Sequence, residues 1–228
     1  MLKSQLLLVV VAFVLLGVVA FVTVSRLKSF DRTVSVRGLC ERELMADRAI
    51  YPISYKETGN NLAELYATVN AKNQQIVQFL KENGIDASEI SIAAPKINDQ
   101  RSYVGNYTDR YVLTSVVNVY TDKVQTILDI ESKQSQLMEN GIAVGSGDDW
   151  NNPVIYEFVG LNDIKPEMIE EANQNARKAA EQFAKDSHSR LGKIQTATQG
   201  LFSIESRDAN TPYVKKVRVV TNVTYYLR

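Results

Sequence analysis

The stretch LNDIKPEMIEEANQNARKAAEQFAKDSHSRL, residues 161–191, predicts one long amphipathic helix, and the fold can be built outward from it. Pro166 suits the first turn, because the amide that proline lacks has no helical partner there. Several alanines on one side let another backbone come close, so we expect this helix to pack tightly on a sheet. The small and apolar side chains recur at three- and four-residue spacing, which places them on one stripe: Ile169, Ala172, Ala176, Ala179, Ala180, Phe183, Ala184 and Leu191.

Strands and shorter helices are predicted on both sides of the long helix. Runs of β-branched and aromatic residues between glycine, proline and asparagine indicate strands, and apolar residues at helical spacing indicate helices. From residue 45 to residue 159 the order is strand, helix, strand, strand, helix, strand, which is the ferredoxin-like split β-α-β pattern. The expected strands are residues 33–39, 45–56, 88–97, 110–120, 154–159, 193–204 and 213–227, and the expected helices are residues 62–82 and 124–138.

The fold class that this order predicts is α+β. We expect a βαββαβ core with mostly antiparallel pairing, which is extended by the long third helix and by a C-terminal β-ribbon.

The N-terminal segment is strongly apolar. Residues 6–24, LLLVVVAFVLLGVVAFVTV, contain no charge; as a helix they would span about 28 Å, close to the hydrocarbon core of about 30 Å. The alternative is a cleaved signal peptide, but its apolar region is usually shorter and ends at a small-x-small site. We therefore expect residues 1–28 to be a transmembrane signal-anchor and residues 29–228 to be one domain, with a cleaved form as the alternative.

Composition excludes several classes of function. The whole chain has no net charge, but residues 1–28 hold three basic and no acidic side chains, which leaves the rest with a net charge of −3. Nucleic acid needs a basic patch, so we expect no nucleic-acid partner. One cysteine, Cys40, excludes an internal disulfide, and one histidine, His188, removes most metal and triad chemistry.

Cys40 is the first candidate for chemistry. A reactive thiol needs its pKa lowered by positive charge or a helix N-terminus. Arg37 and Arg42 lie nearby in sequence, but Glu41 and Glu43 offset them. A small, half-buried residue at the end of a strand is therefore the preferred interpretation.

The remaining candidates are also better explained without chemistry. His188 lies in the last turn of the long helix, where a cation would stabilise the helix dipole by about 0.3–1 kcal/mol. Asp148, Asp149 and Glu157 offer oxygen ligands for a cation, but the pair lacks the spacing of a calcium loop. The three glycines between residues 141 and 147 match neither a dinucleotide fingerprint nor a Walker sequence. We therefore predict no catalytic residue, no cofactor and no metal.

Two segments are candidates for binding. The last strand would pair with a neighbouring subunit if it lay at a sheet edge, whereas a central strand would already be paired, and its lysines could instead block edge pairing. The loop at residues 98–106 is a candidate site for a peptide or small ligand. The residues concerned are Tyr213, Val217, Val219, Val223 and Tyr225 in the strand, and Tyr103, Tyr107 and Tyr111 in and after the loop.

Several motifs together resemble the bacterial SIMPL-domain family, in particular its membrane-anchored branch. They are VSVRGLCEREL and MADRAI near the start, FLKENGI and ASEI in the middle, and LNDIKPEMIEEANQNARKAAEQFAKDS, LGKI, QGLFSI and TPYVKKVRVVTNVTYYL towards the end. The resemblance covers residues 33–227. One departure is Cys40, at a position where alanine or another small residue is expected.

The resemblance implies an exported envelope protein that is linked to stress defence and surface antigens, self-assembles and has no established catalytic motif. Our first hypothesis is therefore a non-enzymatic homo-oligomer, held by a single N-terminal span in the cytoplasmic membrane with its body facing the periplasm. The second is a periplasmic module that binds a peptide or a small ligand. An enzyme is the third hypothesis.

Overall fold

The computed structural model describes residues 15–21, 32–102, 105, 107–145 and 152–228. The chain divides into two compact units. The first comprises residues 1–42, 162–204 and 216–228, and the second comprises residues 43–161 and 205–215. The predicted boundary between residues 28 and 29 stays a prediction.

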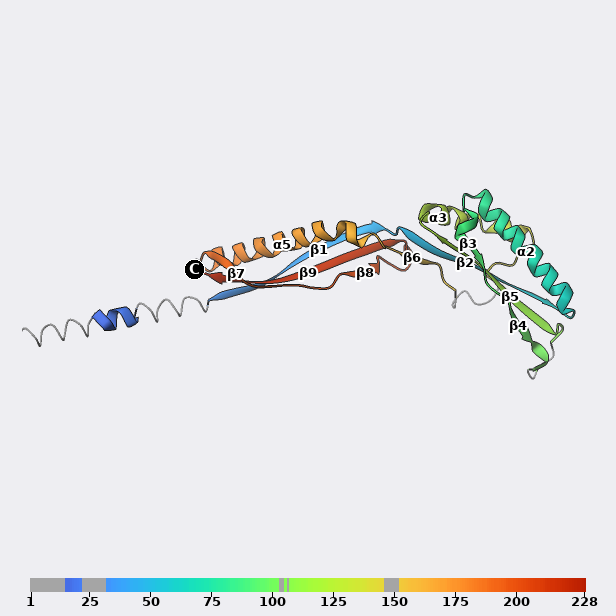
Figure 1. Cartoon of the computed structure of the whole chain (residues 1–228), viewed down its shortest axis with the longest axis horizontal. Helices are drawn as coiled ribbons and strands as arrows, with labels where there is room; N and C mark the ends of the chain where they lie inside the picture. The colour runs from blue at the N-terminus through green and yellow to red at the C-terminus, as the bar shows by residue number, and fades with distance from the viewer. Residues whose placement is uncertain (1–14, 22–31, 103–104, 106, 146–151) are drawn as a thin grey trace, which may run out of the picture. The chain divides into compact units, whose positions relative to one another are not determined.

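The first unit is a sheet with one long helix on it. Strand β9 (Val214–Leu227) lies between β1 (Thr33–Met45) and β7 (Leu191–Gln199), and β8 (Ser203–Ser206) pairs with β9 further along. Helix α5 (Leu161–Asp186) runs along β1 and β9 (Figure 1). The hydrophobic core of this first unit contains side chains from α5, β1 and β9.

The alanine stripe explains why α5 lies so close to the sheet. Ala172, Ala176, Ala180 and Ala184 are all buried, and Asn175 donates a 2.9 Å hydrogen bond to the carbonyl oxygen of Leu39 in β1. Tight packing of this stripe on a sheet is as predicted. Phe183 differs from the prediction, because its side chain is 60% exposed.

The second unit is an antiparallel sheet covered by helices. Its strands lie in the order β3-β5-β2-β6, and β4 pairs with the far part of β5. The helices pack their buried apolar residues on this sheet. In chain order the elements are β2 (Arg48–Gly59), α2 (Leu62–Glu82), a 3₁₀ turn (Ala87–Glu89), β3 (Ile90–Ile92), β4 (Lys96–Asp99), a second 3₁₀ turn (Gln100–Ser102), β5 (Tyr111–Thr121), α3 (Val124–Ser132), α4 (Ser135–Glu139) and β6 (Ile155–Glu157).

A buried polar cluster joins α2 to this sheet. The side-chain oxygen of Asn73 in α2 lies 2.8 Å from the Tyr55 hydroxyl of β2 and 2.9 Å from the Ser115 hydroxyl of β5. All three residues are buried, so their polar groups satisfy one another instead of water.

The structure has mixed α+β architecture, but the predicted fold needs three corrections. Among the described residues no helix is both long and apolar enough to cross a membrane, whereas the sequence predicted a transmembrane helix within residues 1–28. Most of the apolar run at residues 6–24 lies outside the described residues.

The second correction concerns the C-terminal ribbon, which was expected to extend the sheet of the βαββαβ segment. Strands β7, β8 and β9 instead form a separate sheet with β1. The third concerns three elements that are interrupted. The strand predicted at residues 193–204 is split into β7 and β8. The strand predicted at residues 88–97 is split into β3 and β4 before Pro95, which has no amide hydrogen for a strand ladder. The helix predicted at residues 124–138 is broken into α3 and α4 at Lys133.

Candidate functional site

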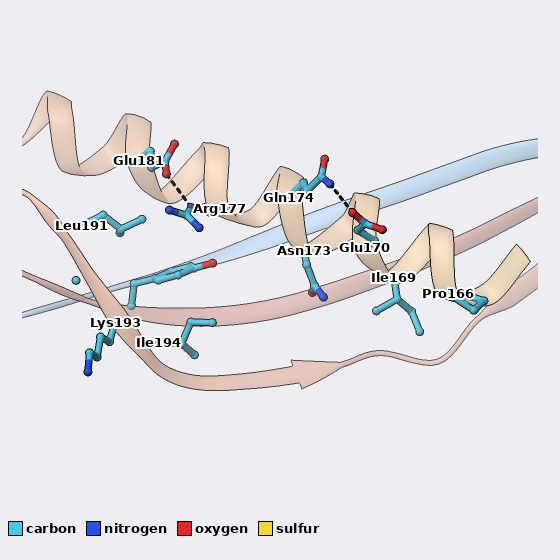
Figure 2. Close-up of a pocket in the computed structure, with 12 residues that line it drawn as sticks. Pro166, Ile169, Glu170, Asn173, Gln174, Arg177, Glu181, Leu191, Lys193 and Ile194 are labelled. Atoms are coloured by element: carbon cyan, nitrogen blue, oxygen red, sulfur yellow. Dashed lines mark hydrogen bonds and ion pairs between the residues drawn. The ribbon is translucent and has the colours of Figure 1, made fainter.

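An open groove of about 800 Å³ runs between α5 and the first residues of β7, within the first unit (Figure 2). Helix α5 supplies one wall and β7 the other. Five apolar side chains line the groove: Pro166, Ile169, Leu191, Ile194 and Tyr225. Polar side chains line the rest of it: Glu170, Asn173, Gln174, Arg177, Glu181 and Lys193.

Most of the polar groups on the helix wall are already paired with one another. Arg177 forms a 2.9 Å ion pair with Glu181, and Gln174 donates a 3.1 Å hydrogen bond to Glu170. The ion pair raises the pKa of Arg177. Both pairs are at i,i+4 spacing on an exposed helix surface, where such pairs add little to the stability of the protein. Their effect is to fix the side-chain conformations of this wall of the groove.

Strand β7 is an open edge of its sheet. Among the strands that the structure describes, it pairs only with β9. Every residue from Lys193 to Gln199 is exposed. Proteins usually protect such edges with charges, prolines or coverage by another element, but this strand carries one charge and no proline. The opposite edge strand, β1, carries four charged residues in its sequence TVSVRGLCERELM.

The geometry of β7 next to the groove is irregular. The pairing of β7 with β9 shifts register on both sides of Ile194, and such bulges re-aim side chains near functional sites. Gly192 lies so close to β9 that a β-carbon there would be 2.8 Å from the carbonyl oxygen of Tyr226. Strand β7 is therefore in tight backbone contact with β9 at Gly192, which also lines the groove.

The candidate self-association strand is β9, and it is central in its sheet. Its neighbours β1 and β7 pair with it on both sides, which is the alternative that the sequence left open. Val217, Val219, Val223 and Tyr225 are buried. Tyr213 precedes the strand and packs edge-to-face on Tyr156, with ring centroids 6.0 Å apart. A part for these residues in self-association stays a prediction.

The three candidate tyrosines of the loop differ in their surroundings. Tyr103 lies outside the described residues. Tyr107 is 52% exposed and lines two hollows with Gln100. Tyr111 is half-buried beneath the guanidinium of Arg110, which lies 4.7 Å from the ring centroid. Ligand binding by these tyrosines stays a prediction.

Cys40 and His188, two described residues that were candidates for chemistry, each have a structural role. Cys40 is 1% exposed, and burial raises the pKa of its thiol. The nearby Glu171 carboxylate raises this pKa further. His188 has a φ of 52° and ends α5, because its amide bonds to the carbonyl of Lys185 while Ser189 bonds back to Ala184.

The aspartates at positions 148 and 149 lie outside the described residues, and Glu157 lies in β6. Within the described part of the chain, no three His, Cys, Asp or Glu side chains are grouped so that they could hold a metal ion.

Sequence reasoning missed the groove, although it includes Tyr225 from the predicted ribbon. A signal was present in the segment IQTATQ of β7, which is uncharged and β-prone but was not distinguished from β9. Which of two adjacent strands is the outer one depends on pairing with β1, far away in the sequence.

A comparison with known protein families identifies the family of this chain. A family model named SIMPL, described as a protein of unknown function (DUF541), matches residues 34–225. The chain belongs to the SIMPL family. No curated protein matches it significantly. The matched residues of this SIMPL protein include the whole groove, and the family description assigns no activity or ligand to it.

Proposed function

We propose that this SIMPL protein is a non-catalytic binding protein that captures an extended segment of another polypeptide in the groove between α5 and β7. The observation that carries the proposal is the exposed edge of β7, which pairs only with β9 among the described strands and lies beside a groove lined by both apolar and polar side chains. An added strand would satisfy the main-chain groups of that edge, while its side chains on one face would enter the groove.

The shape of the site favours a polypeptide over a small molecule. Small ligands are usually enclosed by their pockets, whereas this groove has exposed residues along both of its walls. The edge also repeats the same donors and acceptors along its length, which suits a ligand with the same repeat. The segment should be mainly uncharged and β-prone, with an apolar residue facing Ile194.

The non-catalytic part of the proposal rests on the candidate chemical groups. The Cys40 thiol is buried and has a raised pKa, so it is a poor nucleophile. His188 is held at the end of α5 by backbone hydrogen bonds. Neither residue lines the groove.

Self-association is the second candidate function. The uncharged edge of β7 would also accept a strand from another copy of the chain, which would agree with the homo-oligomer expected from the family resemblance. Light scattering of the full-length protein over a wide concentration range tests this directly. A location on the periplasmic side of the cytoplasmic membrane and a link to stress defence stay predictions, because they rest on the resemblance.

The binding proposal is tested with a labelled peptide and the full-length protein. The probe is an end-blocked peptide of alternating valine and threonine, about nine residues long to match β7. Binding is followed by fluorescence anisotropy, and the same peptide N-methylated at every residue serves as the control without main-chain donors. We expect the first peptide to bind and the second to bind at least about tenfold more weakly.

A protein variant completes the test. Thr196→Lys with Thr198→Lys places two charges on the open edge of β7 and should abolish binding. The matched control is Thr33→Lys, an exposed position on the opposite edge strand, β1, and it should bind normally. Equal binding by both variants, or equal binding of both peptides, would contradict the proposal.

A further inference from the structure

Three arginines meet at one end of the first unit. Arg190, just before β7, and Arg228, just after β9, exchange two backbone hydrogen bonds, of 2.5 and 2.8 Å. The backbone carbonyl of Arg32 accepts a 2.8 Å hydrogen bond from the amide of Leu227, and the Arg32 guanidinium donates a 3.2 Å bond to the Ser189 hydroxyl. The three arginines are therefore neighbours in space, although they are far apart in the sequence.

This end of the first unit has a positive net charge. We call residues 32, 185–193 and 227–228 the basic end, where the end of α5, the start of β7 and the end of β9 come together (Figure 1). Five exposed basic side chains lie there: Arg32, Lys185, Arg190, Lys193 and Arg228. Against them are two carboxylates, those of Asp186 and of the Arg228 main chain, which leaves a net charge of +3. None of the five basic side chains forms an ion pair with an acidic side chain in the part of the chain that the structure describes.

The positive charge is concentrated at this end and not spread along the unit. The first eleven residues of α5, 161–171, carry four acidic side chains and one basic side chain, Lys165. Basic residues at the end of α5 suit the negative end of the helix dipole. Arg32 and Arg228 flank strands, however, so the helix dipole does not account for the whole cluster.

An apolar segment precedes the basic end in the sequence. Residues 6–24 carry no charge, and in the described part of this segment Leu15, Leu16 and Phe21 are 60%, 67% and 75% exposed. Exposed apolar side chains of this kind favour lipid over water. From residue 24 to Arg32 the chain can span at most about 30 Å, so a lipid surface that contacts the apolar segment is within reach of the basic end.

We propose that the basic end of the first unit binds a lipid surface of negative charge, with Arg32, Arg190 and Arg228 contacting lipid phosphate groups. Arginine suits this contact, because its planar guanidinium can bond to two phosphate oxygens at once. Clusters of basic side chains are attracted to anionic lipids, and the attraction falls off within about 8–10 Å at physiological salt. The inference goes beyond the proposed function, because it concerns a different surface and needs no bound segment.

Lipid binding by the basic end would also set where the groove lies. Leu191, which lines the groove, directly follows Arg190. With the basic end on a lipid surface, the groove therefore begins next to that surface. Polypeptide segments held near the same surface would then be the nearest ligands of the groove.

The test uses the full-length protein and two kinds of vesicle, one of phosphatidylcholine alone and one of phosphatidylcholine with phosphatidylglycerol. Binding is measured by flotation in about 0.1 M salt. We expect the wild-type protein to partition at least about tenfold more strongly onto the anionic vesicles. This preference should disappear in about 1 M salt, which screens the charges.

A pair of substitutions locates the contact. Arg190→Gln with Arg228→Gln removes two charges from the basic end and keeps the backbone hydrogen bonds between these residues. At about a fivefold change in affinity for each basic residue, the preference should fall at least about tenfold. The matched control, Lys165→Gln with Arg218→Gln, removes the same charge from exposed positions about 30 Å back along α5 and β9. The control should keep the preference, and thermal melts check that both variants are folded.

A second measurement covers the case in which the apolar segment alone holds the protein on both kinds of vesicle. A donor dye is attached to Ser187→Cys in a Cys40→Ala background, because Ser187 is exposed within the basic end. Energy transfer to acceptor dyes on the lipid headgroups then reports how close this end lies to the surface. Transfer should be greater on anionic than on neutral vesicles, and the difference should be lost with Arg190→Gln and Arg228→Gln.

The outcomes decide the inference in either direction. Loss of the preference or of the extra energy transfer in the basic-end variant, but not in the control variant, supports it. A wild-type protein that shows neither stronger binding nor greater transfer on anionic vesicles overturns it. Equal losses in the two variants also overturn it, because the net charge of the protein and not the basic end would then be responsible.

Discussion

A β-carbon on Gly38 would lie 1.8 Å from the carbonyl oxygen of Ala172 and 2.6 Å from the amide nitrogen of Ala176. Strand β1 and helix α5 therefore meet backbone to backbone at this point. The contact explains why the helix presents alanines and the strand presents glycine, since a larger residue on either side would separate them. It also holds α5 in the position that forms one wall of the groove.

Gly38→Ala should be strongly destabilising, because the two nearest neighbours of the new methyl group are backbone atoms that cannot move aside. We expect the free energy of unfolding to fall by about 3 kcal/mol or more, measured by urea denaturation. Gly59→Ala is the control, because its β-carbon would meet only the Leu65 side chain at 3.6 Å. A similar loss in both variants would contradict the backbone contact.

Two buried tyrosines of β2 should respond differently to loss of their hydroxyl groups. Tyr55 is 1% exposed and its hydroxyl lies 2.8 Å from Asn73 Oδ1, whereas Tyr51 is 3% exposed and its hydroxyl has no hydrogen-bond partner among the described residues. Tyr55→Phe should cost about 1–2 kcal/mol because it leaves a buried acceptor with one bond fewer. Tyr51→Phe should be neutral or stabilising.

Thermal and urea denaturation of the two variants, side by side, checks this difference. The tyrosines lie on the same strand and lose the same atom, so each is the control for the other. Equal destabilisation by both changes would mean that the Asn73 cluster contributes nothing specific.

Local patterns predicted much of the secondary structure. The strand at residues 110–120 and the helix at residues 62–82 are present as β5 and α2, because alternation and helical spacing depend only on neighbouring residues. The alanine stripe of α5 was predicted for the same reason. Phe183 was misplaced on that stripe because spacing alone does not say how wide the contact with a sheet is.

Pairing between distant strands was not predictable in the same way. Strand β9 joins β1, at least 169 residues away in the sequence (from Met45 to Val214), and this pairing decides that β7 rather than β9 is the open edge. The groove depends on that choice, so Tyr225 was predicted only as a self-association residue, and Asn173 and Ile194 were not predicted at all. The bulge at Ile194 could not be predicted either, because a short, mostly polar strand has no alternation of apolar and polar residues that a bulge would interrupt.

Glu131→Gln should alter how stability depends on pH. Burial raises the pKa of Glu131, although the hydroxyl of Tyr156 donates a 3.0 Å hydrogen bond to it. A carboxyl group with a raised pKa in the folded state favours the protonated form, so its contribution is present below the ordinary value of 4.5 and is lost as the pH rises through the folded pKa. The uncharged variant does not lose this contribution.

Melting temperatures of the two proteins from about pH 4 to about pH 8 test this expectation. The variant should melt close to the wild type at the acidic end and above it at neutral pH. Glu139→Gln, an exposed change in α4, is the control and should give parallel curves. A difference from the wild type that is the same at every pH would show that Glu131 is not the group responsible.

The Cys40 thiol should be inert in the folded protein. It is 1% exposed, and burial raises its pKa, so both access to the thiol and the fraction of thiolate are low. A thiol-reactive disulfide reagent should therefore label the native protein at least about a hundredfold more slowly than the urea-unfolded protein. Cys40→Ala should remain folded, since alanine is small and apolar, with a loss of no more than about 1–2 kcal/mol. Rapid labelling of the native protein, in a sample whose melting curve shows it to be folded, would restore Cys40 as a candidate redox residue.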